Sequence, residues 1–180
     1  MMEGEQNLVE DARRGDPEAF GVLYDYYLPR IYRFVLFKVS SKEHAEDITQ
    51  YTFLKAWENI RTYRPQGHAF GSWLYRIARN AVIDHYRKRG PHLDIQEVSP
   101  EVLGIDNSLI AKLDIKIQWE TILVAISKLQ EVEQDVLIMR FVEDMPHGEV
   151  AKAVDKSESA VKVIQHRALK KLKEDLNKNK

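Results

Sequence analysis

The chain has 180 residues, of which 44% are apolar and 31% charged, and it contains no cysteine. This composition is typical of a globular protein with one ordinary domain or two small ones. The lack of cysteine excludes disulfides and thiolate metal sites and fits a reducing compartment. No signal-peptide pattern opens the chain, and no apolar run approaches the roughly 18 residues of a membrane span. We therefore expect a cytoplasmic protein without membrane contact.

The net charge of −1 is the sum of four segments of alternating sign. Lys and Arg counted against Asp and Glu give −4 for residues 1–60, +6 for 61–92, −8 for 93–155 and +5 for 156–180. A polyanion responds to the local field of a surface and not to the sum over the molecule. The two basic segments can thus bind phosphates, although a single charge run is more often just a solvated surface.

Helical signals fill the first half of the chain. Asp16-Pro17 has the form of an N-cap followed by the first helical residue. Ser40 and Glu43 have the spacing of a capping box, and apolar residues then recur at helical spacing up to Trp57. After a Pro- and Gly-containing stretch at 64–67, another helix is expected from about Ser72 to about residue 88.

Residues 90–107 form an acidic stretch that contains Gly, Pro and Ser and shows no clear hydrophobic period, which predicts a linker. Beyond it, helices are expected at 109–129, 131–142, 148–154 and after the turn 155–157. No strand pattern persists. The predicted fold class is all-α, with two small helical domains joined by a flexible linker, the second a helix-turn-helix domain. The expected boundaries are 1–89, 90–107 and 108–180.

The last helix separates its residues into two faces. Val161, Ile164 and Ala168 share an apolar side that must pack on other helices. In a helix-turn-helix the N-terminal part of the second helix meets base edges, so Lys162 could reach a guanine and Val163 a thymine methyl. A Lys-rich helix end that merely complements the helix dipole is almost as good an explanation. The exposed side carries Ser159, Lys162, Val163, His166 and Lys170, flanked by Arg167.

The basic segment 61–92 interleaves aromatic residues with arginines. Arginines that follow a backbone, beside aromatic rings and an amide, suit single-stranded nucleic acid, because they offer charge for phosphates and faces for stacked bases. Phe70 and Trp73 could equally be core residues. The pattern includes Tyr63, Phe70, Trp73, Arg64, Arg76, Arg79 and Asn80.

Two stretches closely resemble the region 2 helices of bacterial extracytoplasmic-function (ECF) sigma factors. They are His44-Ala-Glu-Asp-Ile-Thr-Gln-Tyr-Thr-Phe-Leu-Lys-Ala-Trp57 and Phe70-Gly-Ser-Trp-Leu-Tyr-Arg-Ile-Ala-Arg-Asn-Ala-Val-Ile-Asp-His-Tyr-Arg-Lys-Arg89. The segment from Leu129 through Leu172 resembles region 4 of the same family. The resemblance implies an alternative sigma factor that binds core RNA polymerase, directs it to specific promoters and initiates transcription.

The resemblance also implies roles for individual residues. Contact with the β′ clamp helices of polymerase falls on Glu46, Asp47, Gln50, Phe53 and Lys55. Capture of a flipped base of the −10 element and contact with melted DNA fall on Tyr63, Arg64, His68, Phe70, Trp73, Arg76, Arg79 and Asn80. Reading of the −35 element falls on Ser159, Lys162, Val163, His166, Arg167 and Lys170. Promoter DNA, core polymerase with its β flap, and a separate anti-sigma protein are the implied partners.

The sequence departs from the family pattern at a few positions. Gln130 stands where a proline is common, and Asp155 stands near a usual turn glycine. Aspartate tolerates a left-handed backbone, so the turn is expected to persist. Ser159-Ala160 replaces a frequent Gly-Thr on the base-reading face, so the promoter sequence cannot be transferred from relatives.

Three other classes of function fit the sequence less well. An enzyme is disfavoured because the chain shows no Gly-rich phosphate loop, no His-Glu-x-x-His and no paired acids beside a histidine; no catalytic residue, metal or cofactor is expected. A stand-alone helix-turn-helix regulator would explain residues 108–180 but not the aromatic and arginine helix. A pure interaction protein would leave both basic helices without a role.

Overall fold

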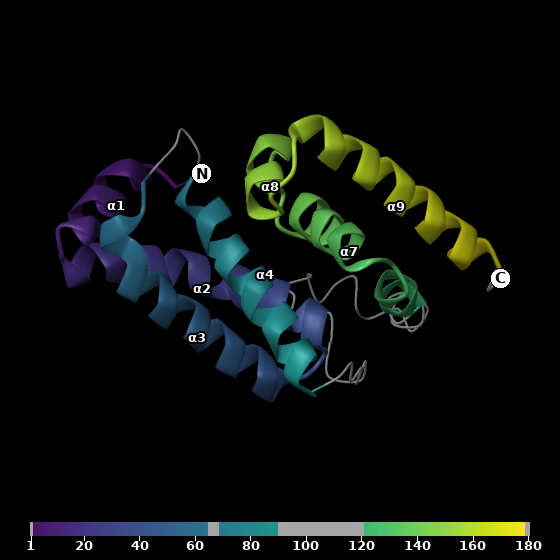
Figure 1. Cartoon of the computed structure of the whole chain (residues 1–180), viewed down its shortest axis with the longest axis horizontal. Coiled ribbons are helices and arrows are strands. Elements are labelled where there is room, and N and C mark those ends of the chain that lie inside the picture. The colour runs from purple at the N-terminus through teal and green to yellow at the C-terminus, as the bar shows by residue number, and fades with distance from the viewer. Residues whose placement is uncertain (1, 65–68, 90–120, 179–180) are drawn as a thin grey trace, which may run out of the picture.

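The computed structural model describes residues 2–64, 69–89 and 121–178, and every regular element within these ranges is a helix (Figure 1). The all-α prediction is confirmed. The predicted linker 90–107 and the first part of the predicted helix 109–129 lie outside the described residues. Of that helix, residues 121–127 are described and are helical. The three domain boundaries stay predictions.

The first half of the chain forms a helical bundle. Its elements are α1 (Glu5–Arg13), α2 (Pro17–Val39), α3 (Lys42–Asn59), the 3-10 helix η1 (Ile60–Thr62) and α4 (Phe70–Arg89). The long helices α2, α3 and α4 pack on one another, with α1 across one end of α2 (Figure 1). Leu23, Ile31, Phe34 and Tyr75 are among the side chains buried between them.

Local capping signals set the ends of α2 and α3. Asp16 accepts hydrogen bonds from the N–H groups of Glu18 and Ala19 in front of Pro17, as predicted. The prediction of Ser40 as the next cap is wrong by one residue. Ser40 ends α2 in a left-handed conformation, with φ 54°, and Ser41 caps α3 by accepting from the N–H of His44. Two long helices joined by so short a connection need a sharp turn, and Ser40 makes it.

The second half contains α7 (Glu131–Leu137), the π-helix η3 (Ile138–Val142), α8 (His147–Ala153) and α9 (Glu158–Lys178). The expected single helix 131–142 is therefore corrected. It is α-helical only to Leu137 and then widens to a π turn, in which the N–H of Glu143 bonds to the carbonyl of Ile138 at 3.1 Å. This widening brings Glu143 toward the first bundle.

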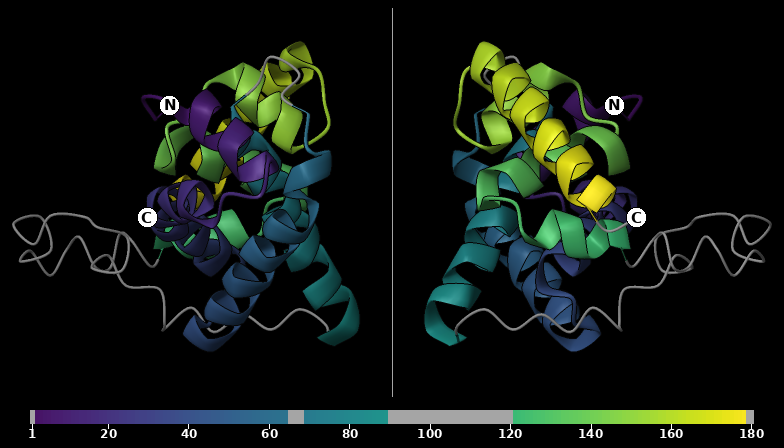
Figure 2. Two further views of the ribbon diagram at one scale, coloured as in Figure 1. Left: turned by 90° about the vertical axis from the view of Figure 1, so that its left-hand side faces the viewer. Right: turned by 90° about the vertical axis from the view of Figure 1, so that its right-hand side faces the viewer.

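The two bundles share one hydrophobic core. The buried cluster that begins at Val9 continues through Val136 and Val150 to Val161, and α8 packs directly against α4 (Figure 2). A smaller cluster of Leu129, Leu137 and Ala168 joins α7 to α9. The arrangement of the second bundle against α4 decides which side chains of α4 face water.

Candidate functional site

The outer face of α3 carries most of the residues predicted to contact polymerase. Glu46, Asp47 and Gln50 are exposed. Lys55 is partly exposed and pairs with Glu58 at 2.7 Å. Phe53 differs from the other four, because it is buried in the core with its ring 4.7 Å from that of Tyr24.

Two apolar residues on the same helix were missed by the sequence reasoning. Tyr51 and Leu54 are about half exposed, at 47% and 54%. Trp57 is also exposed on one side, while its ring packs on Phe20 at 4.9 Å. The signal was present, since Tyr51 and Leu54 fall outside the buried stripe of α3. Large apolar side chains beside charged ones on a free surface are typical of a protein interface.

The predicted single-strand face of α4 divides into exposed and paired residues. Asn80 is exposed. The Arg79 Nε donates to Asp135 Oδ2 at 2.7 Å and its NH2 group to Glu131 at 3.0 Å. Arg76 lies 3.9 Å from the carboxylate of Asp155. Both arginines therefore point toward acids of the second bundle.

The aromatic residues in front of α4 lie mostly in the core. Tyr63 and Phe70 are buried, and their ring centroids lie 5.6 Å apart. Burial raises the pKa of Tyr63 to about 12. Trp73 is partly exposed and lies 4.7 Å from the Tyr63 ring. Phe70 is therefore a core residue, which was one of the two alternatives for it. Trp73 keeps part of its ring exposed to solvent.

The two remaining residues of this group lie at the edge of the same loop. Arg64, the last described residue of the range 2–64, is exposed. His68 lies outside the described residues.

A buried carboxylate from α1 fixes the start of α4. Glu5 accepts a hydrogen bond from the N–H of Phe70 at 2.8 Å and another from the hydroxyl of Tyr27 at 2.6 Å. Burial first, and then the bond to Glu5, raise the pKa of Tyr27. Gly71 packs directly on the Tyr27 ring. Sequence reasoning missed Glu5, because no local pattern connects residues 65 positions apart.

A second carboxylate reaches the start of α4 from the other bundle. Glu149 of α8 accepts from the N–H of Ala69 at 3.1 Å, and the hydroxyl of Ser72 donates to its second oxygen. The first turn of α4 is thus held by Glu5 from its own bundle and by Glu149 from α8.

The helix-turn-helix prediction is reproduced by α8 and α9. Asp155 adopts the expected left-handed conformation, with φ 55°, in the turn. Ser157 then caps α9 by accepting from the N–H of Ala160 at 3.2 Å. Val161 and Ala168 are fully buried on the inner side of α9. The connection between α8 and α9 therefore contains the left-handed Asp155 that the sequence predicted for this turn.

The outer side of α9 presents all six predicted base- and phosphate-contacting residues to solvent. Val163 is 48% exposed although it is apolar. Lys162 pairs with Glu158 at 2.8 Å, and this hydrogen bond lowers the pKa of the Glu158 carboxyl. The six are Ser159, Lys162, Val163, His166, Arg167 and Lys170.

Comparison with known families identifies both halves of the chain. Residues 23–91 match the family model described as Sigma-70 region 2, and residues 125–174 match Sigma-70, region 4. Together these models cover more than half of the chain. The fold and the site therefore define a transcription initiation factor of the sigma-70 class.

Relatives narrow the class. The ECF RNA polymerase sigma factor BldN of Streptomyces coelicolor is 38% identical over 92% of this chain, which spans 63% of the length of BldN. SigX of Bacillus subtilis, also an ECF sigma factor, is 30% identical over 88% of this chain and 84% of its own length. The chain belongs to the ECF RNA polymerase sigma factors. This membership favours a sigma factor over a stand-alone helix-turn-helix regulator, which would leave the region 2 match without explanation.

A solved structure shows the same fold. CnrH in complex with the cytosolic domain of CnrY matches 98% of this chain and 99% of CnrH, with a TM-score of 0.72 and 23% identity. Within the described ranges, no helix has the length and apolar character that crossing a bilayer requires.

Proposed function

We propose that three surfaces carry the three contacts of a sigma factor, with the outer face of α3 on polymerase, the start of α4 on the −10 element and the outer face of α9 on the −35 element. The observation that carries this proposal is that matches to region 2 and region 4 occur in one chain whose polar faces on α3 and α9 are both exposed. A protein that made only one of the two DNA contacts would leave either the region 2 match or the region 4 match unexplained.

For polymerase docking, we assign Glu46, Asp47 and Gln50 as the polar contacts with the β′ clamp helices, with Lys55 beside them. Tyr51 and Leu54 add exposed apolar area next to these charges. Phe53 acts from inside the bundle by holding α3 on α2. A charged rim around an apolar centre is the usual composition of a protein interface.

For the −10 element, Trp73 offers a ring face, Asn80 an amide, and Arg76 and Arg79 positive charge for a strand taken out of the duplex. Tyr63 and Phe70 support Trp73 from the core. Arg64 and His68 belong to the loop in front of α4 and complete the proposed contact set.

For the −35 element, the N-terminal half of α9 enters the major groove. Lys162 and Val163 read base edges, with Ser159, His166 and Arg167 around them, and Lys170 contacts phosphate. The β flap of polymerase is the proposed contact of the same domain.

The remaining assignments are that the protein acts in the cytoplasm, has no catalytic activity of its own, and is inhibited by a separate anti-sigma protein. CnrH, which has the same fold, was solved with the cytosolic domain of CnrY. The anti-sigma partner of the present chain is assigned only as a class.

Run-off transcription tests the proposal. Purified protein is added to core RNA polymerase and a promoter library, and we expect transcripts from a defined subset of promoters. Tight duplex binding by the protein alone, with no promoter-dependent transcript in the presence of core, would instead identify a stand-alone regulator.

A further inference from the structure

We infer that Glu5 of α1 is a positioning residue for the −10 contact, and that its carboxylate fixes the aromatic cluster against which an unpaired base would stack. The aromatic cluster consists of Tyr63, Phe70 and Trp73. The inference rests on the proposed −10 role of the start of α4. It adds a residue from a helix that lies outside residues 23–91, the range matched to region 2.

The Glu5 carboxylate is buried and both of its oxygens are occupied. Glu5 is only 4% exposed. Its Oε1 accepts a hydrogen bond from the N–H of Phe70 at 2.8 Å, and its Oε2 accepts one from the hydroxyl of Tyr27 at 2.6 Å. Hydrogen bonds to a carboxylate are shorter and stronger than neutral ones, and a buried carboxylate that lost them would be costly. The two bonds therefore hold the first residue of α4 at a fixed place on α1.

Phe70 transmits the position of Glu5 to the aromatic cluster. Its ring centroid lies 5.6 Å from that of Tyr63 and 5.4 Å from that of Trp73, and the rings of Tyr63 and Trp73 lie 4.7 Å apart. Phe70 and Tyr63 are buried, whereas Trp73 is partly exposed. Because the three rings pack on one another, a displacement of Phe70 has to move Trp73 as well. The exposed ring is thus placed from the buried end of the cluster.

Tyr27 of α2 provides a second connection from Glu5 to α4. Its ring centroid lies 5.8 Å from that of Phe70. Gly71 packs so closely on this ring that a Cβ would lie 2.8 Å from a ring carbon. The bond to Glu5 fixes the Tyr27 ring, and the ring in turn fixes the backbone at Gly71. One carboxylate therefore places the first two residues of α4.

Stacking of a single base requires an accurately placed ring. A binding site has to be held within about 0.5 Å of its productive geometry. Without the Glu5 carboxylate, the Phe70 N–H and the Tyr27 hydroxyl would be buried donors without an acceptor, so the start of α4 would shift to satisfy them. Only a fraction of the molecules would then present Trp73 correctly, and the affinity for the unpaired strand would fall by that fraction.

Two substitutions of Glu5 separate hydrogen bonding from core packing. Glu5→Leu keeps a side chain of similar size that accepts no hydrogen bond. Glu5→Gln keeps one oxygen for the Phe70 N–H, and its amide group can donate to the Tyr27 oxygen, so it restores both connections without the charge. The expected order of −10 function is native, then Glu5→Gln, then Glu5→Leu. A role in core packing alone would favour leucine at this buried position.

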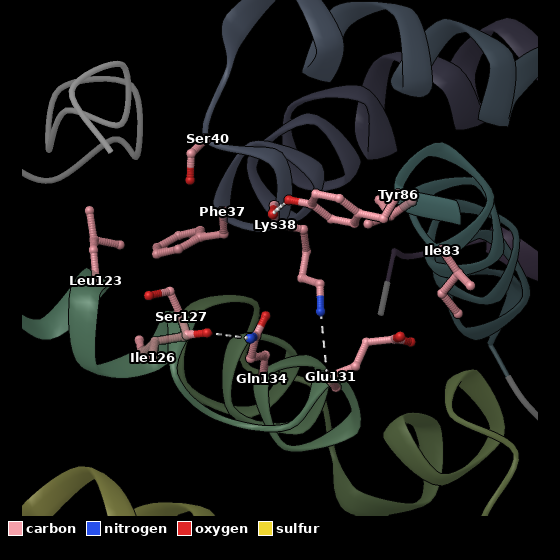
Figure 3. A pocket seen from close by; sticks show the side chains of 11 residues that line it. Phe37, Lys38, Ser40, Ile83, Tyr86, Leu123, Ile126, Ser127, Glu131 and Gln134 are labelled. Atoms are coloured by element: carbon pink, nitrogen blue, oxygen red, sulfur yellow. Dashed lines mark hydrogen bonds between the residues drawn. The ribbon is translucent and has the colours of Figure 1, made fainter. Parts of the chain in front are cut away.

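Phe37→Leu is the control for lost stability. Phe37 borders a cavity of about 280 Å³ toward the other end of α4, where Ile83 and Tyr86 also line it (Figure 3). The smaller side chain enlarges that cavity and destabilises the bundle without touching the aromatic cluster. This variant should open promoters as the native chain does, under conditions in which urea unfolding shows it to be folded.

The test uses the full chain bound to core RNA polymerase and a promoter selected by run-off transcription from a library. Permanganate reactivity of unpaired thymines measures the fraction of open complexes. We expect about a tenfold loss for Glu5→Leu, for a competent fraction of about one-tenth, and a loss of about twofold to threefold for Glu5→Gln. Base substitutions across the promoter should show a weaker preference at the flipped −10 base, with the −35 preference and the affinity for core unchanged.

Several results would overturn the positioning role. They are native opening by Glu5→Leu, an equal loss for Phe37→Leu at matched stability, and an unchanged preference at the flipped base. If Glu5→Leu does not fold, Tyr27→Phe takes its place, because it keeps the ring and removes one of the two bonds. Reduced opening by Tyr27→Phe would then support the role, and native opening would overturn it.

Trp73→Ala distinguishes failure of the proposed −10 contact. Reduced opening by Trp73→Ala, together with native opening by Glu5→Leu, would remove only the positioning by Glu5. Native opening by Trp73→Ala, or the lack of any promoter-dependent transcript with the native chain, would remove the −10 contact itself and the positioning with it.

Discussion

Arg33 and Glu143, 110 positions apart in the chain, form a two-point ion pair in which the Glu143 side chain has no exposed surface. Arg33 lies in the middle of α2, whereas Glu143 directly follows the π turn η3. The pair joins the two bundles at a point outside all of the proposed DNA and polymerase contacts.

A double-mutant cycle with Arg33→Gln and Glu143→Gln should give a coupling free energy of about 2 kcal/mol in urea unfolding. We place it at the low end for a buried charge pair, because Arg33 keeps part of its surface in water. The exposed pair Lys55 and Glu58 on α3 is the matched control and should show coupling near the limit of measurement. Additive effects at Arg33 and Glu143 would mean that the pair does not join the bundles in solution.

Combined Lys162→Ala and Val163→Ala should change promoter choice while polymerase binding stays intact. Both side chains are exposed on the outer face of α9, so their removal costs little folding stability. Each lost base contact should reduce discrimination by about 1–3 kcal/mol. Transcript profiles across a promoter library measure the change, and an unaltered profile would contradict the assignment of this face.

Asp47→Ala should weaken association with core polymerase without altering the −35 preference. Asp47 is exposed on α3, and its carboxylate forms no hydrogen bond or ion pair within the described residues, so its loss should not unfold the bundle. Competition with a labelled reference sigma factor for core polymerase gives the affinity. Glu18→Ala, at an exposed position on α2, removes a carboxylate elsewhere in the same bundle as the control. Equal affinity for both variants would contradict the docking role of Asp47.

Gly71→Ala should destabilise the first bundle by about 1–2 kcal/mol. A Cβ at Gly71 would lie 2.8 Å from the Tyr27 ring, which is buried and hydrogen-bonded to Glu5 and so cannot easily move. The overpacking cost of about 1–3 kcal/mol exceeds the gain in helix propensity. Gly21→Ala, where a Cβ meets nothing within 4 Å, should instead stabilise α2 by about 0.5–1 kcal/mol. Chemical denaturation of both variants measures the change in the free energy of unfolding, which should be negative for Gly71→Ala and positive for Gly21→Ala.

The free energy of unfolding should fall as pH rises above about 10. Burial raises the pKa of both Tyr27 and Tyr75 above the ordinary value of 10.0. Their stabilising contribution is complete below the unfolded pKa and is lost as pH rises toward the folded one, at about 1.4 kcal/mol per pH unit for each tyrosine. Urea unfolding of Tyr75→Phe should show a shallower decline over the same range, and an unchanged slope would exclude Tyr75 as a contributor.

Local signals predicted much of the architecture. Asp16 with Pro17 specified the start of α2, and the backbone tolerance of Asp155 specified the turn before α9, because each depends on atoms within a few residues. The exposure of Val163 followed from helical spacing alone. The shift from Ser40 to Ser41 is an error of one residue in a place where two adjacent serines compete for one cap.

Some features had no local signal. The π turn at Ile138–Val142 places Glu143 against the first bundle. The spacing of apolar residues in the sequence does not reveal it, because that spacing also fits a regular α-helix. The bond from Glu5 to the start of α4 joins residues 65 positions apart. Neither feature can be recognised without the packing that makes it favourable.

The sequence by itself determined the all-α class, the four charge segments and the two nucleic-acid-binding patterns, because helical periodicity, caps and charge are local properties. Only the tertiary structure decided which of these residues face water. Phe53 and Phe70 are buried in the core, and Arg79, which the sequence predicted as a free cation, forms an ion pair with Asp135. Burial and ion pairing between distant segments depend on how whole helices pack, and that packing places an acidic domain on a basic helix.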